Sequence, residues 1–179
     1  MSERLWFQSS VEGLFVRGVG SAMTKSLAGR LAVIGIDLNA LAPAYPAEVM
    51  TEAIRVTAAE LYPERASAEG QRELGRVFMR GFGQTFIGAA MVQFMKVIGP
   101  RRTLERMQRN FRNGSNFIET RFTAIDERTA TLWFNDVSGM PEFYAGILEE
   151  GGRTTGTAGV SVSFTPGEGA DCTFRVTWS

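Results

Sequence analysis

Arginines form the one local concentration of charge in this sequence. Arg102, Arg106 and Arg109 fall at helical spacing in the segment RRTLERMQRNFR, where Glu105 is the sole acid. Guanidinium groups on one helix face can bind a phosphate, a nucleotide or an acidic partner through paired hydrogen bonds. The alternative is a solvated face whose arginines pair with the acids at positions 142, 149 and 150. The spacing leaves both interpretations open.

The overall charge weighs against nucleic acid as the partner. The chain has 179 residues, with 19 basic and 19 acidic side chains and a formal net charge of zero. A neutral chain creates no global field toward nucleic acid or an anionic bilayer. We therefore expect a homodimer or an acidic protein partner if the arginine face is an interaction site.

Aromatic side chains are the second group that could bind a ligand. Most such residues belong to a core. However, an aromatic sheet over a helix rich in glycine and methionine also lines apolar ligand cavities. The sequence leads us to a hypothetical pocket for a small apolar ligand, lined by Phe82, Phe86, Phe94, Phe122, Trp133 and Tyr144.

Catalytic and metal sites find little support in the residue types. The chain has no histidine, and Cys172 is its single cysteine. A histidine general base, a Ser-His-Asp triad, a histidine-ligated haem, an internal disulfide and the common zinc sites are therefore excluded. The carboxylate pairs Glu119/Asp126 and Asp136/Glu142 have no fixed separation, which hydrolase chemistry requires. We expect no catalytic residues, no metal and no cofactor.

The segment from Gly81 to Phe86, GFGQTF, begins like a dinucleotide-binding fingerprint. It lacks the third glycine, and no predicted strand precedes it. Inside a helix the backbone N–H groups are already hydrogen-bonded, so they cannot bind a phosphate. Helix packing is the better explanation of these glycines.

The elements that would position these residues follow from the apolar periodicity. Residues 72–98 can form one long helix that is apolar on most of its circumference and bare of side chains at Gly81, Gly88 and Ala89. A helix with this pattern is buried, and the bare strip allows a neighbouring backbone to come close. We predict that it is the central helix of the fold.

The period changes from helical to alternating after Gly114. Residues 117–125 and 130–135 predict one hairpin, and residues 160–164 and 172–178 a second. Pro141 is expected to open a helix between them. The prediction is a single α+β domain over residues 1–179, with a helical part at 9–113 and a four-stranded antiparallel sheet part at 116–178.

Several segments together resemble the domain-of-unknown-function 2378 family, abundant as paralogues in myxobacteria. The similarity covers nearly the whole chain and implies no activity. It is carried by SSVEGLFVRGV, GIDL, the Leu61-Tyr62-Pro63 helix end, LGRVFMRGFGQTFIGAA, IGPRRTLERM, NGSNFIE, PEFYAGILE and FRVTW.

The C-terminal half is also similar to the end of 4-vinyl reductase domains. The segment PEFYAGILEEGGRTTG and the closing strand CTFRV carry this resemblance. Those domains share a fold with TRAPP subunits and haem nitric-oxide-binding domains. The resemblance implies an α+β fold, often dimeric, whose cavity between helices and sheet holds aromatic effectors, acyl chains or haem. A haem site is not carried over, because the chain has no histidine. A zinc site is not carried over either, because Cys172 matches only one of the cysteines that zinc-bearing members use.

We therefore expect a non-enzymatic regulatory or sensory domain that holds a small apolar ligand between its helices and its sheet. The alternative is a homodimeric interaction or adaptor module that uses the arginine face. Residues 1–10 lack the basic flank and the apolar run that are typical of a signal peptide, and the apolar run at 82–98 is too short and too mixed to span a bilayer. The expectation is a soluble cytoplasmic protein.

Overall fold

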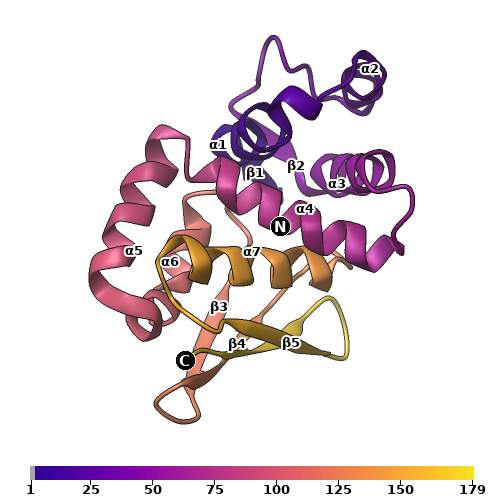
Figure 1. Cartoon of the computed structure of the whole chain (residues 1–179). Helices are drawn as coiled ribbons and strands as arrows, with labels where there is room; N and C mark the ends of the chain where they lie inside the picture. Colours follow the sequence, from indigo (N-terminus) through magenta and orange to yellow (C-terminus); the bar gives the residue numbers. More distant parts are fainter. Residues whose placement is uncertain (1–2) are drawn as a thin grey trace.

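The computed structural model describes residues 3–179, so the first two residues of the predicted domain lie outside it. A mainly helical part comes first, and a strand–strand–helix–strand–strand unit follows, as predicted (Figure 1). In chain order the elements are β1 (Leu5–Phe7), α1 (Gln8–Val11), a π-helix η1 (Glu12–Val19), a 3₁₀ turn η2 (Gly20–Ala22), α2 (Lys25–Ile34), β2 (Ala44–Pro46), α3 (Ala47–Leu61), α4 (Ser67–Phe82), α5 (Phe86–Glu105), α6 (Met107–Arg112), β3 (Thr120–Ala124), β4 (Thr129–Phe134), α7 (Pro141–Thr154), β5 (Ser161–Pro166) and β6 (Cys172–Thr177).

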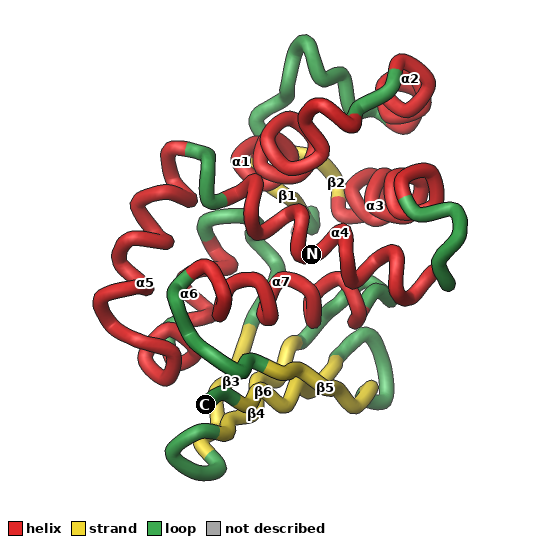
Figure 2. Tube along the Cα trace, viewed as in Figure 1, coloured by secondary structure: helices red, strands yellow, loops and turns green. Residues whose placement is uncertain are grey.

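The four-stranded sheet is antiparallel, with the order β3-β4-β6-β5. The two hairpins meet through their last strands, where Leu132 of β4 pairs with Phe174 of β6. Side chains alternate across a strand, so the inner face carries Leu132, Phe174 and Val176 while threonines and arginines face outward. Helix α7 links the hairpins and lies over the inner face (Figure 2).

Helix α4 lies at the centre of the helical layers and packs on α7, η1 and α3. Glycines allow this packing. A Cβ atom at Gly75 would collide with the carbonyl oxygen of Phe143 in α7, and one at Gly146 with the carbonyl oxygen of Arg72. Likewise, Gly81 lies directly against the backbone of Gly13 in η1. Of the bare strip predicted from the sequence, Gly81 therefore lies in a backbone-to-backbone contact, whereas Gly88 packs on the carbonyl group of Phe82 and Ala89 is exposed.

The predicted single helix over residues 72–98 is wrong, because the chain breaks between α4 and α5. Residues 83–85 form a turn, and the hydroxyl of Thr85 caps the new helix by accepting a hydrogen bond from the N–H of Gly88 at 3.1 Å. A second kink lies at Gly99, whose φ of 78° is left-handed, directly before Pro100. The apolar period runs through both interruptions and conceals them.

A second, two-stranded sheet was not predicted. Strand β1 pairs with β2, and the side-chain oxygen of Asn116 accepts a hydrogen bond from the N–H of Leu5 at 2.8 Å. This arrangement buries Trp6 beside Phe78 and Phe117. The small sheet therefore joins the N-terminal segment to the residues directly before α3. Within residues 3–179, no helix is long and apolar enough to cross a membrane.

Candidate functional site

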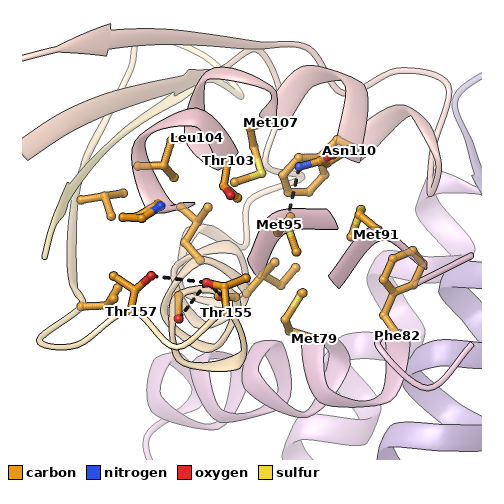
Figure 3. A pocket seen from close by; sticks show the side chains of 18 of the residues that line it. Met79, Phe82, Met91, Met95, Thr103, Leu104, Met107, Asn110, Thr155 and Thr157 are labelled. Carbon is orange, nitrogen blue, oxygen red and sulfur yellow. Dashed lines mark hydrogen bonds between the residues drawn. The ribbon is translucent and has the colours of Figure 1, made fainter. Parts of the chain in front are cut away.

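A cavity of about 80 Å³ lies between α5 and α6 on one side and α7 with the nearby strand ends on the other, with α4 closing a third side (Figure 3). Its lining comes from both halves of the fold. The residues are Trp6, Ser10, Phe78, Met79, Phe82, Met91, Met95, Pro100, Thr103, Leu104, Met107, Asn110, Phe111, Gly114, Ile147, Leu148, Gly151, Gly152, Thr155, Thr157, Val160, Val176 and Trp178.

Local sequence explains how the two walls form. Met91 and Met95 lie one turn apart on the inner face of α5, and the kink at Gly99 brings Thr103 and Leu104 onto the same wall. On α7, Leu148 and the glycines after it present a flat, partly bare surface opposite. Because α5 is kinked and α7 is bare there, the two walls leave space between them.

The lining is chemically neutral. Among residues 3–179, no acidic, basic, cysteine or tyrosine side chain lines the cavity. The hydroxyls are used internally: Ser10 donates to the carbonyl of Gly114 at 3.0 Å, and Thr103 to that of Gly99 at 2.8 Å. With no titratable group at hand, the cavity can bind a molecule but has no side chain for acid–base chemistry.

Asn110 is a polar lining residue whose side chain is little used in hydrogen bonds. Its amide donates to the thioether sulfur of Met95 at 3.7 Å, and its side-chain oxygen has no hydrogen-bond partner among the described residues (Figure 3). A thioether is a weak acceptor, so this amide keeps most of its hydrogen-bonding capacity. It is a polar group that a ligand can use inside an apolar space.

Of the six aromatic residues predicted to line a pocket, Phe82 lines this cavity. Tyr144 does not: it is fully buried against Phe111 and Phe134, and its hydroxyl has no hydrogen-bond partner among residues 3–179. Burial raises the pKa of the Tyr144 hydroxyl far above its ordinary value. Tyr144 belongs to the aromatic core beneath the cavity.

The prediction that Phe86 and Phe94 line the pocket is wrong. The break at residues 83–85 rotates both side chains outward. Phe86 is 93% exposed and Phe94 is 46% exposed. The inner positions of α5 are occupied by Met91 and Met95 instead. The sequence had pointed to a methionine-rich helix but not to which of its faces lines the cavity.

The two sheet residues also lie away from the cavity. Trp133 is on the outer face of the sheet, where its indole N–H donates to Asp171 at 3.0 Å and the Arg121 guanidinium lies 4.5 Å from its ring centroid. Phe122 is on the inner face of the edge strand β3, packed against the core. Asn110 and the cavity threonines carried no signal in the sequence that would have singled them out.

The predicted arginine face is exposed. Arg102 lies on α5, Arg106 at the junction and Arg109 on α6. Among the described residues none of the three forms an ion pair, and the Arg106 guanidinium lies 5.3 Å from the ring centroid of Phe94. The sequence also allowed these arginines to pair with the acids of α7, and that part of the alternative is wrong.

The acids of α7 pair with arginines of α4. Glu149 accepts hydrogen bonds from Arg72 at 2.6 Å and from Arg76 at 2.7 Å, and Glu142 accepts one from Arg72 at 2.7 Å. Glu150 lies 3.3 Å from Arg80. Burial by itself would raise the pKa of the Glu149 carboxyl, but the hydrogen bonds from the arginines outweigh it and lower the pKa.

Cys172 is a buried residue of β6 and lies outside the cavity lining. Its thiol donates to the carbonyl of Thr165 at 3.5 Å, and burial raises its pKa to about 11. A protonated, buried thiol is neither a nucleophile nor a metal ligand. Residues 3–179 contain no cluster of histidine, cysteine and carboxylate side chains that could hold a metal ion.

Comparison with known proteins identifies the family. The family model described as "Protein of unknown function (DUF2378)" matches residues 4–179. This chain belongs to that family. Among curated proteins, no sequence matches this DUF2378 member.

Solved structures show that the fold of this DUF2378 member is that of H-NOX domains. An H-NOX protein from S. oneidensis in the Fe(II)NO state has a TM-score of 0.72 at 8% identity, covering 96% of this chain and 98% of that one. The unliganded Fe(II) H-NOX protein from K. algicida has a TM-score of 0.67 at 10% identity, covering 96% and 95%. An oxygen-binding H-NOX domain related to soluble guanylate cyclases has a TM-score of 0.63 at 10% identity, covering 96% and 95%.

The residues of this DUF2378 member do not fit a haem. The chain has no histidine. Among residues 3–179 neither Cys172 nor any tyrosine lines the cavity, so thioethers are the one class of iron ligand that the described lining offers. Within the described part of the chain, the lining has no basic side chain that could neutralise the carboxylates of a porphyrin. The volume of about 80 Å³ is also far below that of pockets for large ligands, roughly 300–1,000 Å³.

Proposed function

We propose that this protein is a sensory domain that binds a small, uncharged, apolar ligand in the cavity between α5–α6 and α7. The observation that carries this proposal is the neutral, methionine-rich lining with the under-used amide of Asn110. The shared fold with H-NOX domains supports a ligand-holding role, since one of those similar domains binds oxygen.

The lining defines the chemical class of the ligand. A charged ligand would lose its hydration without gaining a counter-charge, which carries a large free-energy cost in an apolar site. An uncharged ligand with one hydroxyl or carbonyl group can hydrogen-bond to Asn110 and bury the rest of its surface. Met79, Met91, Met95 and Met107 are flexible and polarizable, so they can adapt to a flat aromatic molecule.

The size of the cavity sets the size of the ligand. Its volume of about 80 Å³ is smaller than the engineered apolar cavity of about 150 Å³ that binds benzene. A ligand of a few heavy atoms fits the cavity as it stands. A larger one requires the methionine side chains or α5 to move outward.

Binding of phenol, compared with benzene, tests the proposal. We expect phenol to shift the amide resonances of the lining residues in NMR titrations of the labelled protein. Replacing Leu148 with tryptophan should fill the cavity and abolish these shifts, because the large side chain occupies the ligand volume. The matched control Val33→Trp, on the exposed surface of α2, should leave them unchanged.

The variant must be shown to be folded by circular dichroism before its result counts. If Leu148→Trp is unfolded, Met95→Phe serves as a milder filling substitution in the opposite wall. Phenol shifts that are equal in wild type and the filled variants, or that scatter over the surface, would contradict the proposed site. Asn110→Leu should weaken phenol more than benzene, because it removes the hydrogen bond alone.

A further inference from the structure

We propose that the outer face of α5 and α6 docks this protein on an anionic membrane surface. The α5–α6 surface is defined by three protruding apolar side chains and three arginines beside them. They are Phe86, Phe94, Val97, Arg102, Arg106 and Arg109. This surface is on the outer side of α5 and α6, so the inference does not depend on a ligand in the cavity.

The apolar part of this surface is unusual for a helix on the outside of a protein. Phe86 is 93% exposed and Val97 is 85% exposed, while the inner face of the same helix is occupied by the cavity methionines. With Ala90 and Phe94 exposed between them, the apolar side chains follow one side of α5 over about three turns. Contiguous exposed apolar residues of this kind mark an interaction site.

The basic part is local and unneutralised. Residues 96–112 contain six basic side chains and one acid, although the whole chain is neutral. Glu105 pairs with Arg101 at 3.4 Å, and among residues 3–179 no ion pair is formed by Arg102, Arg106 or Arg109. The carboxylates of α7 that could have neutralised them are bound to α4.

The apolar part and the basic part meet at Phe94 and Arg106. The guanidinium of Arg106 lies 5.3 Å from the ring centroid of Phe94, so the charged and apolar side chains are in contact. Helix α5 lies at one outer edge of the molecule in Figure 1, and the side chains of Phe86 and Val97 on it are exposed. Protruding aromatics beside arginines suit the boundary between lipid headgroups and acyl chains.

An anionic bilayer fits this shape better than an acidic protein. A protein partner would need a complementary hollow for the protruding Phe86 and Val97, whereas a lipid surface deforms around them. A second copy of the chain would bring the arginines of two copies together, which like-charge repulsion opposes. The observed charge therefore favours a fluid, negatively charged surface.

Vesicle co-sedimentation of the full chain tests this inference. Vesicles of pure phosphatidylcholine are compared with vesicles that contain equal parts of phosphatidylcholine and phosphatidylserine. We expect binding to the phosphatidylserine vesicles at low salt and its loss at high salt, because salt screens the attraction. The triple variant Arg102→Glu, Arg106→Glu and Arg109→Glu should lower the partition coefficient on the order of a hundredfold.

A matched control separates this surface from charge in general. Arg121, Arg128 and Arg175 are exposed on the sheet side, and none forms an ion pair among the described residues. Reversing these three changes the net charge equally and should leave vesicle binding within about twofold, because they lie away from the docking surface. For the apolar part, Phe86→Ser should weaken binding roughly tenfold, and the control Val33→Ser on α2 should not.

Two results would overturn the proposal. One is the absence of binding to phosphatidylserine vesicles at low salt, which would leave the surface to an acidic protein segment or a second copy. The other is an equal loss in the α5–α6 variant and the sheet variant, which would reduce the effect to net charge. Melting temperatures of all variants near that of the wild type establish that each loss is not unfolding.

Discussion

The interface between α4 and α7 and the packing of α5 differ in how closely the backbone is held. Across α4 and α7, Gly75 and Gly146 let the backbones touch, and Glu149 accepts hydrogen bonds from Arg72 and Arg76. In α5, by contrast, most side chains between residues 86 and 97 are exposed, and flexible methionines make the inner contacts. The same fold therefore contains a fixed wall and an adaptable one.

This difference assigns separate tasks to the two regions. Backbone contacts tolerate no displacement, so α4 and α7 define the position of the cavity. Methionine contacts can rearrange, so α5 can adjust the volume of the cavity to the ligand. The cavity lies where the two regions meet.

The largest expected effect is at Gly75. Replacing it with alanine places a Cβ atom where the carbonyl oxygen of Phe143 lies, and neither backbone can yield without moving a helix. We expect a loss of about 3 kcal/mol or more in the free energy of unfolding, measured with urea. Gly151→Ala is the control, because no atom of another described residue outside its immediate neighbours lies within 4 Å of the added Cβ atom. Equal stability of both variants would contradict a fixed α4–α7 wall.

Removing the carboxylate of Glu149 should have the next largest effect. Glu149→Ala leaves Arg72 and Arg76 without their shared partner, and we expect a loss of roughly 3 kcal/mol in the free energy of unfolding. Glu52→Ala is the control, because it removes an exposed carboxylate paired with Arg55. A loss of unfolding free energy in Glu149→Ala no larger than that in Glu52→Ala would contradict this prediction.

The same network predicts a pH dependence. The pKa of the Glu149 carboxyl is lowered in the folded protein from an ordinary value of 4.5, so its stabilising contribution is complete above that pH. The contribution is lost as the pH falls from 4.5 through the folded-state pKa. Urea unfolding across this range should show the wild type approaching Glu149→Gln in stability as the pH falls. A constant difference between the two would show that Glu149 is not the titrating group.

A smaller loss is expected from Gly88→Leu, at the start of α5. A side chain there would collide with the carbonyl oxygen of Phe82, but the turn at residues 83–85 can shift to accommodate it. We expect a loss of about 1–3 kcal/mol, measured as a lower melting temperature. An unchanged melting temperature would mean that α5 is not held at its first turn.

The smallest effect on stability is expected on the outside of α5. Phe86→Ser removes a large apolar side chain that is almost fully exposed, so the free energy of unfolding should change by less than about 0.5 kcal/mol. Chemical denaturation can show this. A loss comparable to that of Gly75→Ala would indicate that Phe86 is packed, and the contrast between the two regions would fail.

The sequence predicted the parts of the fold that depend on local apolar periodicity and on turn residues. The change from helical to alternating apolar residues after Gly114 placed both hairpins, and Pro141 placed the helix between them. The break before Phe86 was missed because apolar residues continue at helical spacing through the turn, although Thr85 is a good capping residue.

The residues of the candidate site were harder to predict from the sequence than the fold, for a physical reason. Phe82 was placed in the lining because α4 is regular, but Phe86 and Phe94 depend on the rotation that the break imposes. Asn110 reaches the cavity through the kink at Gly99 and the packing of α6. These are tertiary relations between segments, which a single-helix pattern does not encode.

Native mass spectrometry of the protein purified from its own host, followed by organic extraction, tests the central claim most directly. The account predicts a small added mass on each chain that the Leu148→Trp variant lacks, and extraction should release an uncharged molecule. A chain that carries no added mass, together with a cavity that admits neither phenol nor benzene, would contradict ligand binding in this cavity.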